Sequence, residues 1–319
     1  MKGVTRALGL AVLVLLPVTA WGTTYTFETV VNPGDPNFTQ LLGINNSSVI
    51  VGYYGDGAVV PNNGFTLTLP YNFTPENFPG STQTQVVGIN GSGETVGFYV
   101  DSMGNTHGFT DVGGTFTTVN NPMTTTSTQL LGVNNAGVAA GAYIGSGGFF
   151  QPFTYAGGTF TAISFSGLMS AKATDVNNAG WVTGFNLTSS TTSQGFLDQG
   201  GTFTFLEFPG STFTQALGLN NDGEVVGIYV DAGGVTHGFT YNISTGIYQS
   251  IDDPFAAGFG GTTINGVNDQ GQIVGFYSDA NQNTDGFVGS PVSAPEPGSL
   301  LFLGTGLIAI ACKFRKQAA

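Results

Sequence analysis

One segment recurs along this 319-residue chain at nearly constant spacing, and it constrains the fold more than any other feature. Its clearest copy runs from Gly218 to Tyr229, and its leading asparagine returns at intervals of 45, 44, 43, 43 and 48 residues. The six positions are Asn45, Asn90, Asn134, Asn177, Asn220 and Asn268. A period of this length indicates a chain built from successive copies of one supersecondary unit.

Each copy contains four short β-strands joined by tight turns. In the fifth copy the extended or alternating stretches are residues 202–208, 214–219, 224–231 and 237–240. The turn Asn221-Asp222-Gly223 supplies residues that tolerate positive φ, as a tight hairpin requires. Four strands in a repeat of roughly 40 to 50 residues are typical of a β-propeller, in which each repeat forms one blade. The sequence therefore predicts an all-β fold, a six-bladed β-propeller over residues 23–290, with a β-solenoid as the alternative.

Two further residues recur in every copy and bear on packing. A glycine in the middle of the third strand weakens that strand unless a neighbouring backbone must approach closely. These glycines are Gly52, Gly97, Gly141, Gly184, Gly227 and Gly275. A phenylalanine in the fourth strand is predicted to be buried between sheets rather than exposed for ligand stacking. These residues are Phe65, Phe109, Phe153, Phe196, Phe239 and Phe287. A ring closes only if strands that start near Tyr25 and end near Val288 meet.

The charge balance excludes several classes of partner. Lys172 is the only Lys or Arg between residues 23 and 291, whereas that region holds 18 of the 19 acidic residues, so its formal net charge is −17. No nucleic-acid partner is expected, because phosphate binding needs clustered Lys and Arg, and an anionic lipid surface is disfavoured for the same reason. The only cysteine is Cys312, outside the repeats, so the repeat region must be stabilised by its core without disulfides.

Residues 1–22 have the pattern of a secretory signal peptide. Lys2 and Arg6 precede an apolar run from Ala7 to Ala20, and small residues follow. The run is shorter than the roughly 20 residues that a membrane-spanning helix needs. We therefore expect export by the Sec machinery, with cleavage after Ala20 or Gly22.

The C-terminus has three parts in a fixed order: a proline-rich linker at residues 291–299, an apolar stretch at 300–312 and a basic tail at 313–319. Pro291, Pro295 and Pro297 are predicted to keep the linker extended and out of strand pairing. The apolar stretch can enter a bilayer as a transmembrane helix, with the basic tail in the cytoplasm. A permanent single-pass anchor is the alternative to a processed one.

Pro295-Glu296-Pro297, the short membrane stretch and the basic tail together resemble the PEP-CTERM sorting signal, which is also catalogued as an ice-binding protein C-terminal domain. The resemblance implies a substrate of exosortase, a membrane transpeptidase of Gram-negative bacteria that make exopolysaccharide and biofilm. It implies an exported protein that is transiently anchored and then reaches the cell surface or extracellular matrix. It gives no indication that the repeats bind ice.

The repeats themselves resemble the extracellular HAF repeat, named for a short His-small-Phe stretch. That stretch is present as His107-Gly108-Phe109 and His237-Gly238-Phe239, while other residues replace the histidine in the remaining copies. The resemblance implies export and repetition, and it brings no catalytic residues. The two histidines occupy the same position in copies two and five, so hydrogen bonding at a strand start is expected rather than catalysis or a shared metal site.

Few residues depart from the repeat pattern, and these are the candidate site residues. Lys172 and Asp175 stand where the sibling copies have Gln or Thr and Gly, so they are either drift or a local ligand contact. A weak calcium candidate is the loop with Asp279, Asn281, Asn283 and Asp285, although it lacks the Gly and closing Glu of an EF-hand. No other cofactor is expected, and no catalytic residue is assigned.

Two classes of function remain. Carboxylates for glycoside hydrolysis would have to come from loop residues such as Asp101, Asp231, Asp252, Asp253 and Asp279. Most of these recur with the copies, which indicates turn capping rather than a unique catalytic site. A repeated polar surface suits weak, multivalent binding. We therefore expect a non-catalytic surface or matrix protein, structural or weakly glycan-binding, with a glycan-processing enzyme that uses one propeller face as the alternative.

Overall fold

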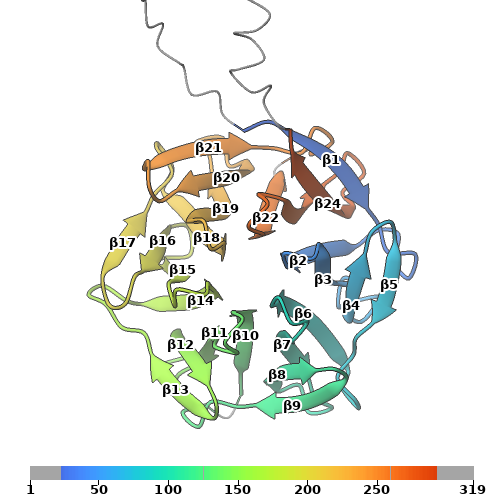
Figure 1. Ribbon diagram of the computed structural model, residues 1–319, viewed down its shortest axis with the longest axis vertical. Helices are drawn as coiled ribbons and strands as arrows, with labels where there is room; N and C mark the ends of the chain where they lie inside the picture. Colours follow the sequence, from blue (N-terminus) through green and yellow to red (C-terminus); the bar gives the residue numbers. More distant parts are fainter. Residues whose placement is uncertain (1–22, 125, 259, 293–319) are drawn as a thin grey trace, which may run out of the picture.

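The computed structural model describes residues 23–124, 126–258 and 260–292. Over these residues the chain forms 24 β-strands and no helix. The strands surround a central axis in groups of four, and one edge strand of each group lies innermost (Figure 1). The chain is thus an all-β, propeller-like ring, as the repeat pattern predicts.

The first three sheets follow one another along the chain, each in simple antiparallel order. The first contains β2 (Thr39–Ile44), β3 (Val49–Tyr54), β4 (Asn63–Thr68) and β5 (Asn72–Pro75). The second contains β6 (Gln83–Ile89), β7 (Thr95–Val100), β8 (Thr106–Val112) and β9 (Thr115–Val119). The third contains β10 (Thr128–Val133), β11 (Ala139–Ile144), β12 (Phe150–Ala156) and β13 (Thr159–Ala162).

The next sheet has eight strands in two groups of four. One group is β14 (Ser170–Val176), β15 (Val182–Leu187), β16 (Ser193–Asp198) and β17 (Phe203–Leu206). The other is β18 (Phe213–Leu219), β19 (Glu224–Val230), β20 (Thr236–Asn242) and β21 (Ile247–Ile251). A single parallel residue pair, Ser193 with Phe213, joins the groups. The last sheet combines β22 (Thr262–Val267), β23 (Ile273–Ser278) and β24 (Thr284–Pro291) with the N-terminal strand β1 (Tyr25–Val30).

The ring is closed by its two ends. Strand β1 pairs antiparallel with β24 over its whole length, from Tyr25 opposite Pro291 to Val30 opposite Gly286. Beyond the strands, the backbone N–H of Val292 donates to the carbonyl oxygen of Thr24 over 2.8 Å. This pairing meets the closure condition and excludes the solenoid alternative.

The prediction that Pro291 stays out of strand pairing is wrong, because Pro291 is the last residue of β24 and lies opposite Tyr25. Proline lacks an N–H, so it disrupts the middle of a sheet, but at a strand terminus the ladder loses no internal hydrogen bond. The ring therefore extends past the predicted boundary at residue 290.

The sheets are offset from the sequence repeat by one strand. Strand β17, which opens the fifth copy in the sequence, pairs with β16 of the preceding group. Each copy thus begins with the outermost strand of the preceding group, and β1 has the same role for the last sheet. Because of this offset, each copy of the repeat contributes strands to two neighbouring groups.

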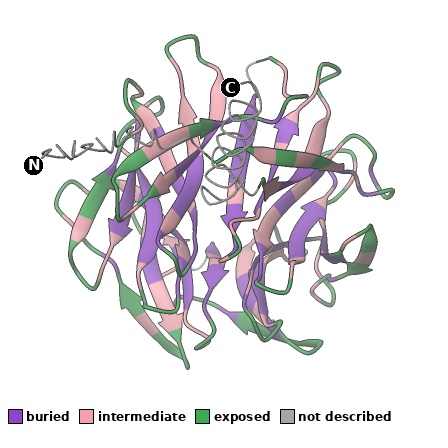
Figure 2. Cartoon of the chain, turned by 45° about the horizontal axis from the view of Figure 1, so that its top comes forward, coloured by how far each residue is buried: buried purple, intermediate pink, exposed green. Residues whose placement is uncertain are grey.

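The packing roles of the repeated Gly and Phe are confirmed. All six strand phenylalanines are at most 1% exposed, and buried residues are concentrated in the strands while the loops are exposed (Figure 2). Each strand glycine faces a backbone carbonyl of the inner strand; a methyl group on Gly227, for example, would overlap the carbonyl oxygen of Gln215 and crowd the Phe239 ring. The glycine is required because the phenylalanine ring and the inner strand occupy the space that a side chain would need.

Candidate functional site

The six repeated asparagines form a closed circle of hydrogen bonds at one end of the central channel. Each side-chain amide donates from Nδ2 to the backbone carbonyl oxygen of the next asparagine, over 3.0 to 3.2 Å. The last bond, from Asn268 to Asn45, closes the circle. Each Oδ1 also accepts backbone N–H groups two and four residues further along its own turn, as Asn134 does from Ala136 and Val138. The asparagine therefore caps its own turn and also ties it to the next one.

A second, outer set of bonds runs through the following residue of each turn. The backbone N–H of Asn135 donates to Oδ1 of Asn178, and that of Asn178 donates to Oδ1 of Asn221. Asp269 takes part with its carboxylate, which accepts from Asn221 and Asn46. Burial alone would raise the pKa of Asp269, but these hydrogen bonds outweigh it and lower the pKa. We call the end with these turns the asparagine face.

Behind this face lies a central cavity of about 200 Å³. Every innermost strand has a β-bulge, which directs one side chain into the cavity. The six bulge residues that line it are Leu42, Val87, Leu131, Thr174, Leu217 and Asn265. The wall is thus largely apolar, and only Thr174 and Asn265 depart from this among the bulge residues.

Both candidate contacts predicted from the sequence, Lys172 and Asp175, lie on the wall of this one cavity. The Lys172 ammonium donates to Oε1 of Gln129 over 2.8 Å and lies 4.1 Å from the ring centre of Phe150. Burial lowers the pKa of Lys172 to about 8, because it disfavours the charged form. Among the described residues, Lys172 is the only basic side chain that lines the cavity.

Asp175 stands where the other five inner strands have glycine, just after the bulge. Those glycines let neighbouring strands approach; a methyl group on Gly88 would lie 2.9 Å from the Cα of Gly132. The Asp175 carboxylate instead reaches the next strand and accepts from the backbone N–H of Leu219 at 2.9 Å and from that of Val176 at 2.8 Å. Burial raises the pKa of Asp175 to about 7 despite these two hydrogen bonds. One cavity thus holds a weakened acid and a weakened base.

Neither the bulges nor the position of Phe185, which also lines the cavity, was predicted from the sequence. A signal for the bulges exists, because each one directly precedes the inner-strand glycine or Asp175, as in Leu42-Gly43 and Thr174-Asp175. That register shift cannot be separated from plain alternation without knowing which strand is innermost.

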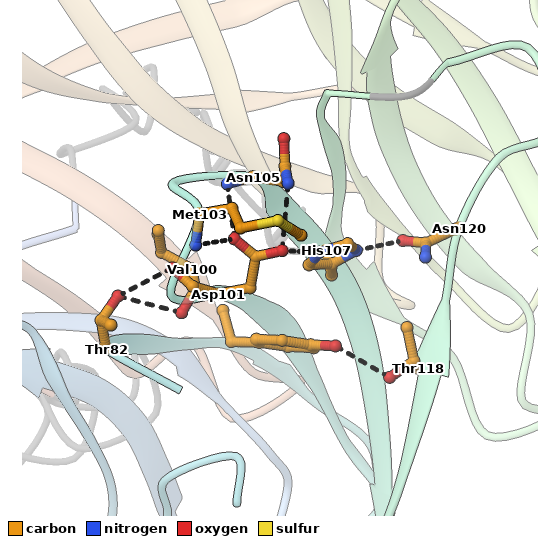
Figure 3. Close-up of polar contacts among 9 residues, drawn as sticks. Thr82, Val100, Asp101, Met103, Asn105, His107, Thr118 and Asn120 are labelled. Carbon is orange, nitrogen blue, oxygen red and sulfur yellow. Dashed lines mark hydrogen bonds and ion pairs between the residues drawn. The ribbon is translucent and has the colours of Figure 1, made fainter. Parts of the chain in front are cut away.

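The two histidines have the structural role expected of them. His107, the second residue of β8, has Nε2 3.1 Å from Oδ2 of Asp101 and Nδ1 3.0 Å from Oδ1 of Asn120 (Figure 3). Hydrogen bonds from Asn105 and His107 hold the pKa of Asp101 well below its usual range. The His107 imidazole also stacks on Tyr99, with ring centres 5.0 Å apart.

In the equivalent sheet, His237 lies between two carboxylates. Its Nδ1 is 2.8 Å from Oδ2 of Asp252, and its Nε2 is 3.4 Å from Oδ2 of Asp231. Partial burial would lower the pKa of His237, but the hydrogen bonds and negative charges of Asp252 and Asp231 outweigh it and raise the pKa. Asp101, Asp231 and Asp252, named above as hydrolytic candidates, are thus engaged with histidines.

The calcium candidates lie in one loop and at the start of the strand that follows it. Both oxygens of Asp279 accept hydrogen bonds from Asn281 and Asn283, through their backbone and side-chain nitrogens. The fourth candidate, Asp285, lies in β24 opposite Tyr277, and Asp253 is buried nearby with one carboxylate oxygen lacking a described partner. Over residues 23–292, without 125 and 259, no group of three or more His, Cys, Asp or Glu side chains is arranged to hold a metal ion. Calcium binding stays a prediction.

Other predictions fall outside the described residues. These are the signal peptide at 1–22, the motif Pro295, Glu296 and Pro297, the transmembrane helix at 300–312 and the basic tail at 313–319. Within the described part, no helix is long and apolar enough to cross a membrane.

A family model, the PEP-CTERM protein-sorting motif, matches residues 293–316. The expected sorting motif is therefore present, and it implies exosortase recognition, export and C-terminal membrane anchoring before sorting. No curated protein matches the sequence.

Several solved structures share the fold at low sequence identity. The putative TolB from Agrobacterium tumefaciens aligns with a TM-score of 0.58 and 12% identity, over 81% of this chain and 92% of that chain. A mutant of AofleA from Arthrobotrys oligospora aligns with a TM-score of 0.53 and 10% identity, over 85% of this chain and 91% of that chain. SapL1 lectin in complex with alpha methyl fucoside aligns with a TM-score of 0.51 and 10% identity, over 82% of this chain and 97% of that chain. These similarities support the propeller fold alone.

Proposed function

We propose that this chain is an exported, exosortase-sorted protein of the cell surface or extracellular matrix, with a non-catalytic role that is structural or weakly glycan-binding. The observation that carries the proposal is the sorting motif at residues 293–316, which starts two residues after the last strand of the ring. Because that strand pairs with β1, the first strand of the described chain, the whole ring would stay attached wherever the C-terminus is held.

We also infer that the ring has six blades built from HAF-type repeats. The eight-stranded sheet consists of two four-stranded groups joined by one residue pair. Each group of four contributes one asparagine to the circle of six. Counting groups therefore gives the same number as counting repeats.

Ligand binding, if it occurs at the central cavity, would use Lys172 and Asp175, the ionisable side chains on its wall. The net charge of −17 over residues 23–291 opposes binding of polyanions at low salt. Neutral glycans, or acidic ones bridged by calcium, are the favoured ligands. SapL1, a lectin solved in complex with alpha methyl fucoside, shares only the fold with this chain, which supports this fold as a carrier of saccharide sites.

A glycan-processing enzyme is the second candidate, because one observation favours it. Asp175 has a pKa raised to about 7 and Lys172 one lowered to about 8, and groups that titrate near neutrality in a cavity are suited to general acid–base chemistry. The two functions make opposite predictions for a bound polymer.

Two experiments test the proposal. Deletion of residues 295–319 should convert a cell-associated protein into a freely secreted one, and retention of the truncated protein with membranes would contradict the sorting role. Incubation of the purified full chain with the host's own extracellular polysaccharide, with and without calcium, should give retention without a change in chain length. Chain shortening that is lost in Asp175→Asn would establish the enzyme instead.

A further inference from the structure

Two of the sheets contain a tyrosine whose ring is covered on both sides. Tyr99, two residues after the strand glycine of β7, stacks against Phe78 with ring centres 3.7 Å apart and an interplanar angle of 8°. His107 covers its other side at 5.0 Å. The same arrangement is formed by Phe208, Tyr229 and His237, at 3.6 and 5.0 Å. In both sheets the tyrosine is thus the middle ring of a three-ring stack.

The β10–β13 sheet has the tyrosine but not its covering rings. Tyr143 stands two residues after Gly141 in β11 and pairs with Gln151, where the other two sheets have histidine. Asn121 takes the position of Phe78. The backbone N–H of Phe78 donates to the hydroxyl of Thr84 in β6, and the backbone N–H of Asn121 donates to the hydroxyl of Thr128 in β10. Among the described residues, the one aromatic neighbour of Tyr143 is Phe153, 6.2 Å away and tilted.

Beside Tyr143 and Gln151 lies an open cavity of about 280 Å³. Its lining comprises Met123, Tyr143, the loop Gly145–Gly147, Phe149 and Gln151. Phe149 is 53% exposed and Met123 is 72% exposed, so two large apolar side chains stand in water at the mouth of one cavity. The Gly145–Phe149 loop is held in a hairpin by bonds between its own ends, from Gly145 N to Phe149 O at 3.0 Å and from Gly148 N to Gly145 O at 2.9 Å.

We propose that this cavity binds one neutral pyranose ring of an extracellular glycan, which makes the glycan-binding part of the proposed function specific to a site. None of the described side chains that line it is charged, so these residues offer no ion pair to a charged ligand. The strongly negative ring further disfavours polyanions. A pyranose has apolar C–H faces and a rim of hydroxyl groups. It matches an aromatic and thioether wall that also carries the amide of Gln151 and the hydroxyls of Tyr143 and Ser146.

The size of the cavity sets the size of the ligand. Cavities for drug-sized ligands measure about 300–1,000 Å³, and this one is slightly smaller and open to solvent. One sugar ring with its neighbours in solvent is therefore expected, rather than an extended, fully enclosed oligosaccharide. A single open subsite gives weak binding, so a dissociation constant on the order of 1 mM is expected.

The test uses the full chain in detergent micelles and saturation-transfer NMR with the methyl glycosides of glucose, galactose, mannose and fucose. At least one should receive saturation from the wild-type protein. Phe149→Ala should weaken its binding about tenfold or more, and Gln151→His, which supplies a ring able to cover Tyr143, should weaken it as well. Phe205→Ala is the matched control, because Phe205 is also exposed, at 43%, but lies on the outer strand β17.

Each outcome separates the site from the wider proposal. Equal saturation in wild type and Phe149→Ala, or saturation of none of the four sugars, overturns the site. If the host polysaccharide is still retained in that case, glycan binding survives at another place. Loss of both overturns the glycan-binding part of the proposed function. Phe149-dependent saturation of an aromatic dipeptide in place of the sugars would assign the cavity to a peptide and refute the pyranose.

Discussion

The two ends of the ring are built on different rules. At the asparagine face, six turns repeat the same side chain, and every one of those side chains is used in a bond to its neighbour. At the opposite end of the strands, the loops between β3 and β4, β7 and β8, and β11 and β12 differ in sequence and expose Val59, Met103 and Phe149. Polar residues that repeat thus hold the ring together, and the residues free to meet a partner are those that do not repeat. The repeated asparagines therefore do not supply the multivalent surface that repetition suggests in the sequence.

The largest effect should come from opening the asparagine circle. Asn134 is 6% exposed, donates to the carbonyl of Asn177 and accepts from Ala136 and Val138. Asn134→Ala leaves these buried groups without partners, so we expect the free energy of unfolding to fall by about 2–4 kcal/mol. The urea midpoint measures it.

The matched substitution on the opposite face is Asn63→Ala. The Asn63 side chain donates to the carbonyl of Pro61 two residues away, at an exposed site. Its loss should change the free energy of unfolding by less than about 0.5 kcal/mol. Similar losses in the two variants would show that the faces do not differ in the way described.

Much of the fold could be predicted from the sequence because each local pattern recurs in all six copies of the repeat. Closure near Tyr25, the buried Phe239 and the crowded Gly227 follow from period, alternation and the position of glycine. The pairing of Pro291 could not be predicted, because the cost of a proline depends on whether its position is internal or terminal in the ladder. That is decided by a strand at the other end of the chain.

The candidate sites were predictable only in part. Lys172 and Asp175 could be singled out because they break the repeat, but their meeting on one cavity wall depends on bulges that alternation conceals. The open cavity beside Tyr143 could not be predicted, because Met123 and the Gly145–Phe149 loop, which line it together, become neighbours only in the folded chain.

A pH-dependent effect should appear at Asp175, the one residue that breaks the glycine pattern behind the asparagine face. Burial raises its pKa from 3.8 to about 7, so between about pH 4 and pH 7 the folded chain binds a proton that the unfolded chain has released. The contribution of the protonated Asp175 carboxyl to the free energy of unfolding is fully present below about pH 4 and is lost as the pH rises through 7. Asp175→Gly, which restores the glycine of the other five strands, should flatten the pH dependence of the urea midpoint in this window. An unchanged slope would place the titrating group elsewhere.

The smallest effect should appear on the opposite face, at His237. Asp252 and Asp231 raise the pKa of His237, so this histidine contributes stability that is present below its unfolded pKa near 6.5 and is lost as the pH rises through the folded value. Asn120 stands beside His107 where Asp252 stands beside His237. Asp252→Asn should therefore remove one of the two charges and lower the pKa of His237, by a modest amount because the pair is partly exposed. With only two histidines in the chain, a proton NMR titration resolves both, and the His107 resonance should be unaffected by a substitution in the other sheet. An unshifted His237 would mean that Asp231 alone sets its proton affinity, whereas a matching shift at His107 would show that the two sheets are coupled across the ring.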